Sequence, residues 1–333
     1  MVASKIVYIS DSESIFPTED IKMLSENYTI SPVLLNLIEK DYIKMFKVGM
    51  TQIIPNIIKS DLSITWTADY HTLFTVFISR LFNKKSIVHI SGMEVSNLPE
   101  INYGYQTTFL RRHAVRWILR NATAIIAPSG SYAQKAREFT KKPVYVVPNY
   151  ADVDPNAPRT KKQPMVIMVA NQYMNADDFV LLKGIGTYNK IAAEMPDIEF
   201  YLLGKIDETI RKSHPNLHYF GWVPHWIVLD YINLSKVYCQ LSYTESFGVS
   251  LLEALQSDCI PVVTDKDGMA ELVEDNGYKI KYGDWETAVK DIREALKDTD
   301  EHTKYSAYYR LKYSRDSRKQ NLTNVIHKVI GAK

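Results

Sequence analysis

Hydrophobic positions in the first half of the chain form short apolar runs, separated by longer segments in which apolar residues recur every three or four positions. The short runs predict buried strands and the longer segments predict amphipathic helices. The expected strands are Lys5–Ile9, Leu62–Trp66, Ser86–Ile90, Ala124–Ala127 and Val144–Val147, and the expected helices cover 18–27, 39–59, 70–82, 105–121 and 129–138. Such alternation indicates βαβ units around a parallel sheet, so the sequence belongs to the α/β class.

A polar, proline-rich segment then interrupts both periodicities and predicts a connector between two domains. Alternation resumes after it, and the chain ends in an amphipathic helix with Asp316 or Ser317 as its expected cap. The second half should hold strands at Met165–Ala170, Glu199–Leu203, 237–243 and 259–264, with helices at 180–195, 248–257 and 286–297. The expected division is 1–149 for the first domain, 150–164 for the connector, 165–312 for the second domain and 313–333 for the last helix.

Length and composition agree with two globular domains. The 333 residues suit two domains of about 150 residues each, and 46% of them are hydrophobic. The net charge of +2 gives no strong nucleic-acid footprint. The two cysteines, Cys239 and Cys259, lie in expected strands and argue against a secreted disulfide scaffold. With neither a signal peptide nor an apolar run of about 20 residues, a cytoplasmic protein is expected.

Two glutamates, Glu245 and Glu253, flank the start of an expected helix in the stretch Y-T-E-S-F-G-V-S-L-L-E-A-L. They follow a strand, and open α/β sheets bind ligands at the carboxyl ends of their strands. Carboxylates accept hydrogen bonds from hydroxyls, and amides at a helix start suit a phosphate, so the pair points to a nucleotide sugar. Alternatively, Ser250 and Glu253 form a capping box that only satisfies the first amides of the helix. Glu245 favours the ligand site, because it caps nothing obvious.

The same segment resembles the E-x7-E signature of GT-B glycosyltransferases, especially the GT4-like retaining enzymes of glycosyl transferases group 1. Its continuation, I-P-V-V-T-D-K-D-G-M-A-E-L-V, is also similar to that family. The resemblance covers about residues 85–300. It implies a GT-B fold with two Rossmann-like domains facing across a cleft, and a C-terminal helix that crosses back to the first domain. It also implies retaining transfer from a nucleoside-diphosphate sugar to an acceptor hydroxyl, with no metal or other cofactor.

The resemblance also implies roles for particular residues. Glu253 would bind the ribose hydroxyls, Glu245 would lie nearer the transferred sugar, and Lys183 would contact the diphosphate. The implied catalytic residues are Glu245, Lys183 and, in the first domain, His89. The implied donor-binding residues are Glu253, Phe247, Gly248, Val249, Ser250, Gly184 and Asn171.

The sequence departs from the family pattern at three places. Most relatives carry an arginine shortly before the lysine, where this chain has Asn171 and Gln172 followed by the acidic insert N-A-D-D-F. Asp267 replaces one glycine of a family pair, and D-S-E-S-I-F-P replaces the glycine-rich loop after the first strand. The missing arginine predicts that Lys183 and the amides near 248–250 carry more of the charge stabilisation.

In the first domain, S-I-V-H-I-S-G-M-E-V is similar to the family's V-x-x-H-G-x-D turn, which suggests an acceptor site. Ser91 takes the place of the usual histidine, and Glu94 that of the acid. His89 lies two residues before Ser91 and faces the same way along a strand, so it either substitutes for that histidine or is a core residue. Weaker candidates are His71 and Asp69, and Asn149 matches a hinge position of the family.

Two further signals are less specific. Asp152-Val-Asp154 mimics the metal motif of the other glycosyltransferase fold, but it lies in the connector, where coincidence is expected. Helix 105–121 interleaves Phe109 and Trp117 with Arg111, Arg112, Arg116 and Arg120. Such a helix is either a solvated basic face or a peripheral contact with a membrane that carries a lipid-linked acceptor.

The expected partners are therefore a nucleotide-sugar donor and a carbohydrate or lipid-linked acceptor, and no nucleic acid. Two other functions stay open at this point: a sugar-nucleotide epimerase of the same fold, and a non-catalytic protein that binds sugar nucleotides. The missing arginine and the missing first-domain glycines make the second of these conceivable.

Overall fold

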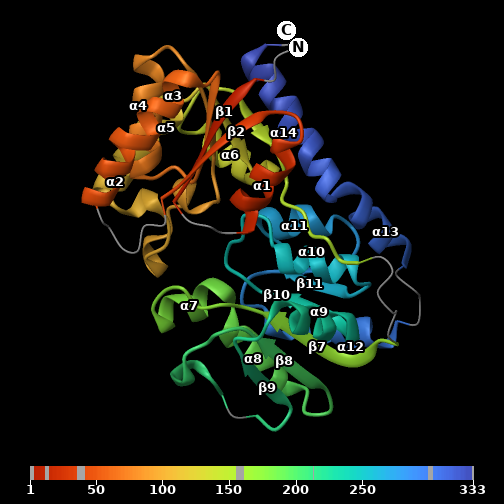
Figure 1. The fold of residues 1–333 in the computed structure, drawn as a ribbon. Helices are drawn as coiled ribbons and strands as arrows, with labels where there is room; N and C mark the ends of the chain where they lie inside the picture. Colours follow the sequence, from red (N-terminus) through yellow and green to blue (C-terminus); the bar gives the residue numbers. More distant parts are fainter. Residues whose placement is uncertain are drawn as a thin grey trace. The chain divides into compact units, whose positions relative to one another are not determined.

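A computed structural model describes residues 4–11, 15–35, 42–154, 161–212, 214–298 and 303–331. The chain divides into two compact units, the first formed by 1–149 with 316–333 and the second by 150–315 (Figure 1). Parts of two predicted segments, 39–41 of a helix and 155–160 of the connector, lie outside the described residues, as do 12–14 of the segment that replaces the glycine-rich loop.

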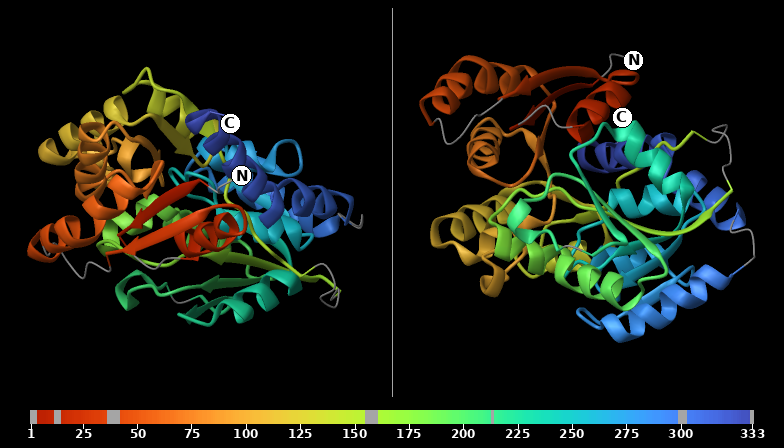
Figure 2. Two further views of the ribbon diagram at one scale, coloured as in Figure 1. Left: turned by 45° about the horizontal axis from the view of Figure 1, so that its top comes forward. Right: turned by 90° about the horizontal axis from the view of Figure 1, so that it is seen from below.

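The described part of the first unit holds a parallel six-stranded sheet in the order β2-β1-β3-β4-β5-β6. Figure 2 shows it from two further directions. The strands are β1 (Lys5–Ser10), β2 (Thr29–Leu34), β3 (Leu62–Trp66), β4 (Lys85–His89), β5 (Ala124–Ala127) and β6 (Val144–Val146). The helices are α1 (Ile15–Ser25), α2 (Tyr42–Val48), a π-helix (Gly49–Ile53), α3 (Ile54–Lys59), α4 (Tyr70–Leu81), α5 (Phe109–Asn121), α6 (Gly130–Arg137) and α14 (Arg315–Ile330). Short 3-10 turns cover Met93–Val95, Pro99–Ile101 and Tyr105–Thr107.

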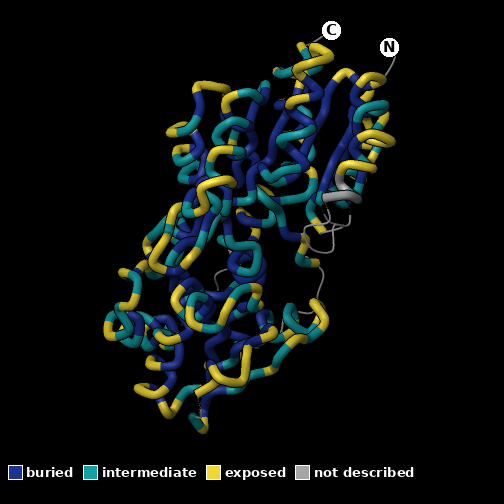
Figure 3. Tube along the Cα trace, turned by 90° about the vertical axis from the view of Figure 1, so that its left-hand side faces the viewer, coloured by how far each residue is buried: buried dark blue, intermediate teal, exposed yellow. Residues whose placement is uncertain are grey.

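Alternate strand residues of this sheet pack into hydrophobic clusters on its two opposite faces, because successive side chains of a strand point to opposite faces. On one face Tyr8 and Ile64 pack against α1 and α14. On the other face Val7 and Ile9 pack on α3 and α4, and Val88 packs on α4, α5 and α6. Figure 3 shows buried stretches of the trace in the interior of the unit and exposed stretches at its surface. The sheet is thus covered on both faces.

The described part of the second unit holds another parallel six-stranded sheet, in the order β12-β11-β10-β7-β8-β9. Its strands are β7 (Gln163–Val169), β8 (Glu199–Leu203), β9 (Leu217–Gly221), β10 (Ser235–Gln240), β11 (Ile260–Thr264) and β12 (Tyr278–Ile280). Its helices are α7 (Ala176–Lys183), α8 (Ile185–Glu194), a 3-10 turn (Glu208–Ile210), α9 (His225–Leu234), α10 (Val249–Gln256), α11 (Asp267–Val273), α12 (Trp285–Lys297) and α13 (Thr303–Lys312). In chain order this is the Rossmann arrangement, and its direction reverses between β7 and β10.

Two cores again cover the two faces of the sheet. Val166, Phe200 and Cys239 pack against α7, α8 and α12, whereas Tyr238 and Val263 pack against α9, α10, α11 and α13. Both cysteines are buried, and burial raises the pKa of both thiols. None of the helices in the described ranges combines the length and apolar character that a membrane span requires.

The predicted α/β fold class is confirmed, and most predicted strands lie within a residue or two of their observed bounds. Three predicted helices differ. Helix 39–59 is divided into α2, the π-helix and α3, helix 105–121 becomes α5 only at Phe109, and helix 180–195 is α7 and α8 separated at Gly184. The acidic insert before Lys183 forms the start of α7, because Asn175 caps it and two aspartates occupy its first turn.

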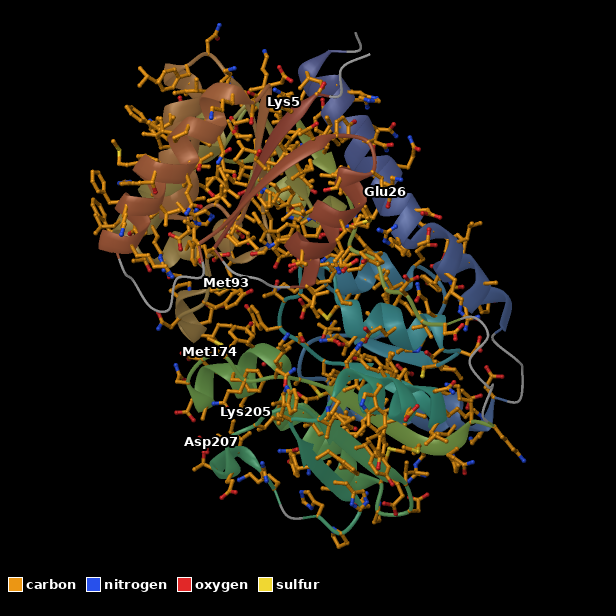
Figure 4. The ribbon with its side chains drawn as sticks, in the orientation of Figure 1. Lys5, Glu26, Met93, Met174, Lys205 and Asp207 are labelled. Atoms are coloured by element: carbon orange, nitrogen blue, oxygen red, sulfur yellow. The ribbon has the colours of Figure 1, made fainter. Side chains whose placement is uncertain are left out.

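The C-terminal helix α14 is part of the first unit. Leu322, Val325 and Ile326 enter the core that also contains Tyr8. The Arg318 guanidinium is 1% exposed and binds the Asp20 carboxylate through Nε at 2.7 Å and through Nη2 at 2.8 Å. Glu26, labelled in Figure 4, lies beside α14, where its carboxylate accepts a hydrogen bond from Lys319.

Candidate active site in the second unit

The candidate site lies at the carboxyl ends of β7 and β10, the two strands between which the sheet order reverses. Helices that follow these two strands lie on opposite faces of the sheet: α7 and α8 on one face, α10 on the other. The loops therefore diverge and leave a crevice at this point, which is where open α/β sheets bind ligands.

Lys183 and Glu245 form an ion pair in these loops. The Nζ atom of Lys183, the last residue of α7, lies 2.8 Å from Oε2 of Glu245, and the side chains are 15% and 21% exposed. Burial opposes the charge on the lysine, but the Glu245 carboxylate outweighs it, and the net effect raises the Lys183 pKa. Lys183 is therefore a cation at neutral pH, held beside a carboxylate that is still accessible to water.

Gly184 permits the close approach that builds this pair. Its φ is +68°, and a Cβ atom there would lie 2.0 Å from the carbonyl oxygen of Leu241. Directly beside this contact, the Tyr243 amide donates to the Leu182 carbonyl at 2.8 Å. A side chain at position 184 would thus force the end of α7 away from the loop that carries Glu245. The direct donor contact predicted for Gly184 stays a prediction.

Glu253, on α10, pairs with a histidine that sequence reasoning missed. Its side chain is 8% exposed, and its Oε1 lies 2.8 Å from Nε2 of His225, the first residue of α9. The hydrogen bond to Glu253 raises the pKa of His225, against the smaller opposing effect of burial. The only sequence signal for His225 is its position just after Pro224 at a helix start, and no spacing connects it with Glu253.

The capping-box alternative is wrong. Helix α10 begins at Val249, with Gly248 at the N-cap, so Ser250 lies inside the first turn and Glu253 in the second. The Glu253 carboxylate instead forms a hydrogen bond with His225, which belongs to the neighbouring helix α9. Because the motif does not cap the helix, its acids need another explanation.

The start of α10 is suited to an anion. Gly248 is the N-cap residue, has a φ of +90° and carries no side chain that could cap the helix. The first amides of a helix have no partner within it, and they carry the positive end of the helix dipole. Phe247 anchors the turn, because its ring is buried and packs edge-on against Tyr313 at 5.6 Å. Val249 and Ser250, the first two helical residues, are half-buried.

Asp267, which departs from the family pattern, ties two loops of the site together. Its φ of +52° is a conformation that glycine adopts freely and aspartate tolerates better than most residues. Its carboxylate accepts a hydrogen bond from Thr244 Oγ1 at 2.6 Å, and the next amide, that of Gly268, donates to the Glu245 carbonyl at 3.0 Å. The aspartate therefore keeps the turn and adds a link to the Glu245 loop.

Asn171 stands just after β7, close to where the family resemblance leads one to expect an arginine. Its Oδ1 accepts a hydrogen bond from the Lys205 amide at 2.9 Å, and the neighbouring Gln172 Oε1 accepts from the Asp207 amide at 2.7 Å. Lys205 and Asp207 lie close to Met174 in Figure 4. These two residues thus hold the loop after β8, and a donor contact by Asn171 stays a prediction.

In the first unit, two of the residues proposed for the acceptor side, His89 and Glu94, are buried. His89 is 2% exposed and stacks on Trp66 at 3.8 Å, and neither ring nitrogen has a hydrogen-bond partner among the described residues. Burial, helped by the Arg318 charge, lowers its pKa well below 6.5, so the ring is neutral at neutral pH. The Glu94 carboxylate accepts from the amides of Ser91, Gly92 and Ala68, which shapes the turn. The catalytic role of His89 stays a prediction.

The remaining candidates also have contacts within the first unit. The His71 ring bonds the Trp66 carbonyl at 2.9 Å, and Asp69 caps α4 and lies 3.4 Å from Arg111. The Asn149 side chain is 3.3 Å from the Arg318 guanidinium. In the described ranges, no three His, Cys, Asp or Glu side chains converge as metal ligands would.

Comparison with known proteins places this site in a family context. Residues 158–312 match the sequence model of the family described as Glycosyl transferases group 1. No match was found among curated protein sequences.

Solved structures share the fold over nearly the whole chain. A sucrose-phosphate synthase from Thermosynechococcus elongatus is similar with a TM-score of 0.71 and 14% identity, and a glycosyltransferase from Rickettsia africae with 0.72 and 12%. The catalytic domain of starch synthase IV from Arabidopsis thaliana, bound to ADP and acarbose, is similar with 0.69 and 10%. Each comparison covers 99% of this chain and 100% of the other. At these identities the likeness shows the fold.

Proposed function

We propose that this chain, whose residues 158–312 match the sequence model of the Glycosyl transferases group 1 family, is a glycosyltransferase of the GT-B fold. It transfers a sugar from a nucleoside diphosphate to an acceptor hydroxyl, with retention of configuration and without a metal. The observation that carries this proposal is the ion pair of Lys183 and Glu245 at the reversal point of the second sheet, beside the start of α10.

The diphosphate and the hydroxyls of such a donor have chemically matching groups in the second unit. The diphosphate binds to Lys183, which is a cation, and to the amides of 248–250, which form the positive end of a helix. The ribose hydroxyls donate to Glu253, whose position His225 fixes. Glu245 accepts from hydroxyls of the transferred sugar while it orients Lys183. A starch synthase of this fold is bound to ADP, which agrees with a nucleotide donor here.

In the proposed reaction the bond between the anomeric carbon and the phosphate oxygen breaks, and its electron pair leaves with the nucleoside diphosphate. The acceptor oxygen bonds to the same face of that carbon, and its proton passes to the departing phosphate oxygen. Negative charge grows on the leaving group as the bond breaks, so Lys183 and the amides of α10 bind the transition state more tightly than the ground state. A glycosyl adduct trapped on Glu245 would contradict this mechanism.

The donor and the reaction are tested in sequence. Thermal unfolding is measured with UDP, GDP and ADP sugars, because a ligand of the native state raises the melting temperature. The donor that binds is then incubated with candidate acceptors, and the products are analysed by mass and by anomeric configuration, with and without EDTA. Glycoside formation of retained configuration that EDTA leaves intact is the expected result. Epimerised donor without glycoside would assign an epimerase, and binding without any turnover would assign a non-catalytic binding protein.

Two glutamate variants separate binding from chemistry. Glu253→Gln should weaken nucleotide binding, whereas Glu245→Gln should lower turnover and leave nucleotide affinity nearly unchanged. Glu194→Gln is the matched control, because its carboxylate pairs with Lys190 on the surface of α8. If both site variants behaved like the control, the proposed donor site would be wrong.

We also propose a carbohydrate acceptor, free or lipid-linked, and a peripheral membrane contact through residues 105–121. The sequence suggested the arginines of this segment as the basis of that contact, but two of them have partners within the first unit. Arg111 pairs with Asp69, and Arg116 donates to the Gln106 side chain at 3.0 Å, so these arginines brace α5 against its own unit.

A further inference from the structure

An apolar groove of about 800 Å³ lies between α4 and α5 of the first unit, two helices that pack side by side (Figure 1). Leu110 is 68% exposed and Phe77 is 53% exposed, although both are large hydrophobic side chains. The main lining residues are Leu73, Phe74, Phe77, Leu110, Ala114 and Trp117. Exposed apolar surface gathered in this way marks a binding surface.

The groove follows from helical periodicity. Residues 110, 114 and 117 recur at intervals of four and three, so they form one stripe along α5, separate from the stripe of Val115, Ile118 and Leu119 that enters the core. Residues 73 and 77 form the matching stripe on α4, and Leu81, 66% exposed, extends it by one turn. Each helix thus has a second apolar stripe, in which Phe77, Leu81 and Leu110 are exposed while Leu73 and Trp117 are partly buried against the core.

A basic hollow lies about one turn further along α5 from the groove. Arg120 lies three residues after Trp117 and so neighbours it on α5. It lines a hollow of about 620 Å³ together with Arg137, Lys141 and Lys142, and Glu138 is the only acid there. The Arg120 and Arg137 side chains donate to the carbonyls of Phe139 and Val144, which fixes both guanidinium groups at its wall. The hollow therefore offers a preformed cluster of positive charge beside apolar surface.

We propose that the groove and the hollow form one docking surface for an anionic lipid bilayer, with acyl chains in the groove and lipid phosphates in the hollow. This inference rests on the membrane contact in the proposed function and assigns the residues that make it. Apolar side chains next to cations are what an interfacial membrane contact requires. A second copy of the chain fits less well, because a two-fold contact through this surface would bring like charges together.

The groove is tested by flotation of the full chain with vesicles of phosphatidylcholine alone and of phosphatidylcholine and phosphatidylglycerol in equal parts. Binding is expected to the anionic vesicles, and Leu110→Glu should weaken it at least about tenfold, because a carboxylate would enter the acyl region. Leu311→Glu is the matched control, since Leu311 is 78% exposed on α13, outside the groove. Equal binding by Leu110→Glu and the control would overturn the proposal.

The hollow is tested by Lys141→Glu combined with Lys142→Glu, which should also weaken anionic-vesicle binding about tenfold or more. Lys297→Glu, at a side chain 75% exposed on α12, is the control. Nucleotide-induced thermal shifts should be unchanged in all these variants, so loss of vesicle binding is separable from failure of the proposed transfer reaction. A concentration-dependent dimer that Leu110→Glu dissociates would assign the groove to self-association and overturn the proposal.

Discussion

At the carboxyl ends of its strands, the first unit pairs Arg318 with Asp20 out of contact with water, whereas the second unit leaves the Lys183–Glu245 pair partly exposed. Both units are doubly wound sheets, so the difference lies in their side chains and not in their architecture. A buried pair with satisfied hydrogen bonds holds a fold together, but it has no capacity left for a ligand. An accessible pair can exchange its partners for phosphate and hydroxyl groups.

The largest effect should follow from breaking the buried pair. Arg318→Met leaves the Asp20 carboxylate buried without a cation, and we expect the first unit to lose about 3–5 kcal/mol of stability. Hydrogen exchange of the β1 amides measures this unit separately from the second. Adding Asp20→Leu should restore part of the loss, because the unpaired charge is then gone. A loss under about 1 kcal/mol would mean that the pair contributes no more than a surface one.

Breaking the exposed pair should affect catalysis instead. Lys183→Met should lower turnover about 10²–10³-fold, the usual cost of losing one group that stabilises developing negative charge. Its unfolding should stay close to wild type, because the side chain is accessible to water. The measurement is kcat with the identified donor, beside thermal unfolding. A strongly destabilised variant would show that this pair, too, is structural.

The two histidines provide a comparison by pH. His89 is buried with a lowered pKa, so the unfolded chain binds a proton at pH values where the folded unit does not. Stability of the first unit should therefore be constant above about pH 6.5 and fall below it, by at most about 1.4 kcal/mol per pH unit. His225 has a raised pKa and acts in the opposite direction. Its contribution to the stability of the second unit is lost as the pH rises through its own raised pKa. The free energy of unfolding of His89→Leu, measured between about pH 5 and 7, checks this. If its slope against pH equalled that of the wild type, the prediction would be contradicted.

The smallest effect is expected at the surface of α14. Lys319 binds Glu26 close to the buried pair, but the carboxylate is about half exposed. Lys319→Met should change stability by less than about 1 kcal/mol, because exposed ion pairs contribute little. A loss comparable to that of Arg318→Met would show that burial is not what distinguishes the two pairs.

The sequence was sufficient for the repeating α/β pattern and for the strands of the two cores, because burial on both faces makes those segments continuously apolar. It missed β2, an edge strand that contains Pro32, and the edge strands β9 and β12, and it also missed α9, α11 and α13. Proline is tolerated at a sheet edge, where one side of the strand needs no donor, but it weakens the sequence signal for a strand.

Without the family resemblance, which implied Lys183, the candidate site could be predicted only where its residues are close in sequence. Glu245, Gly248 and Glu253 stand in one motif, and their shared helix start follows from it. The partners of these acids do not follow, because Lys183 and His225 approach through tertiary packing. The contact of Gly184 with Leu241 is also invisible in the sequence, since only the fold brings the two backbones together.

The return of α14 to the first unit has a consequence for the order of folding during synthesis. Residues 150–315 leave the ribosome as an uninterrupted stretch that contains a whole sheet and both of its helical layers. The preceding stretch, in contrast, must wait for Arg318 to neutralise Asp20 and for Leu322 to fill its core. Residues 150–315 can therefore mature first, and the earlier half is completed only after the segment that forms α14 has also been synthesised.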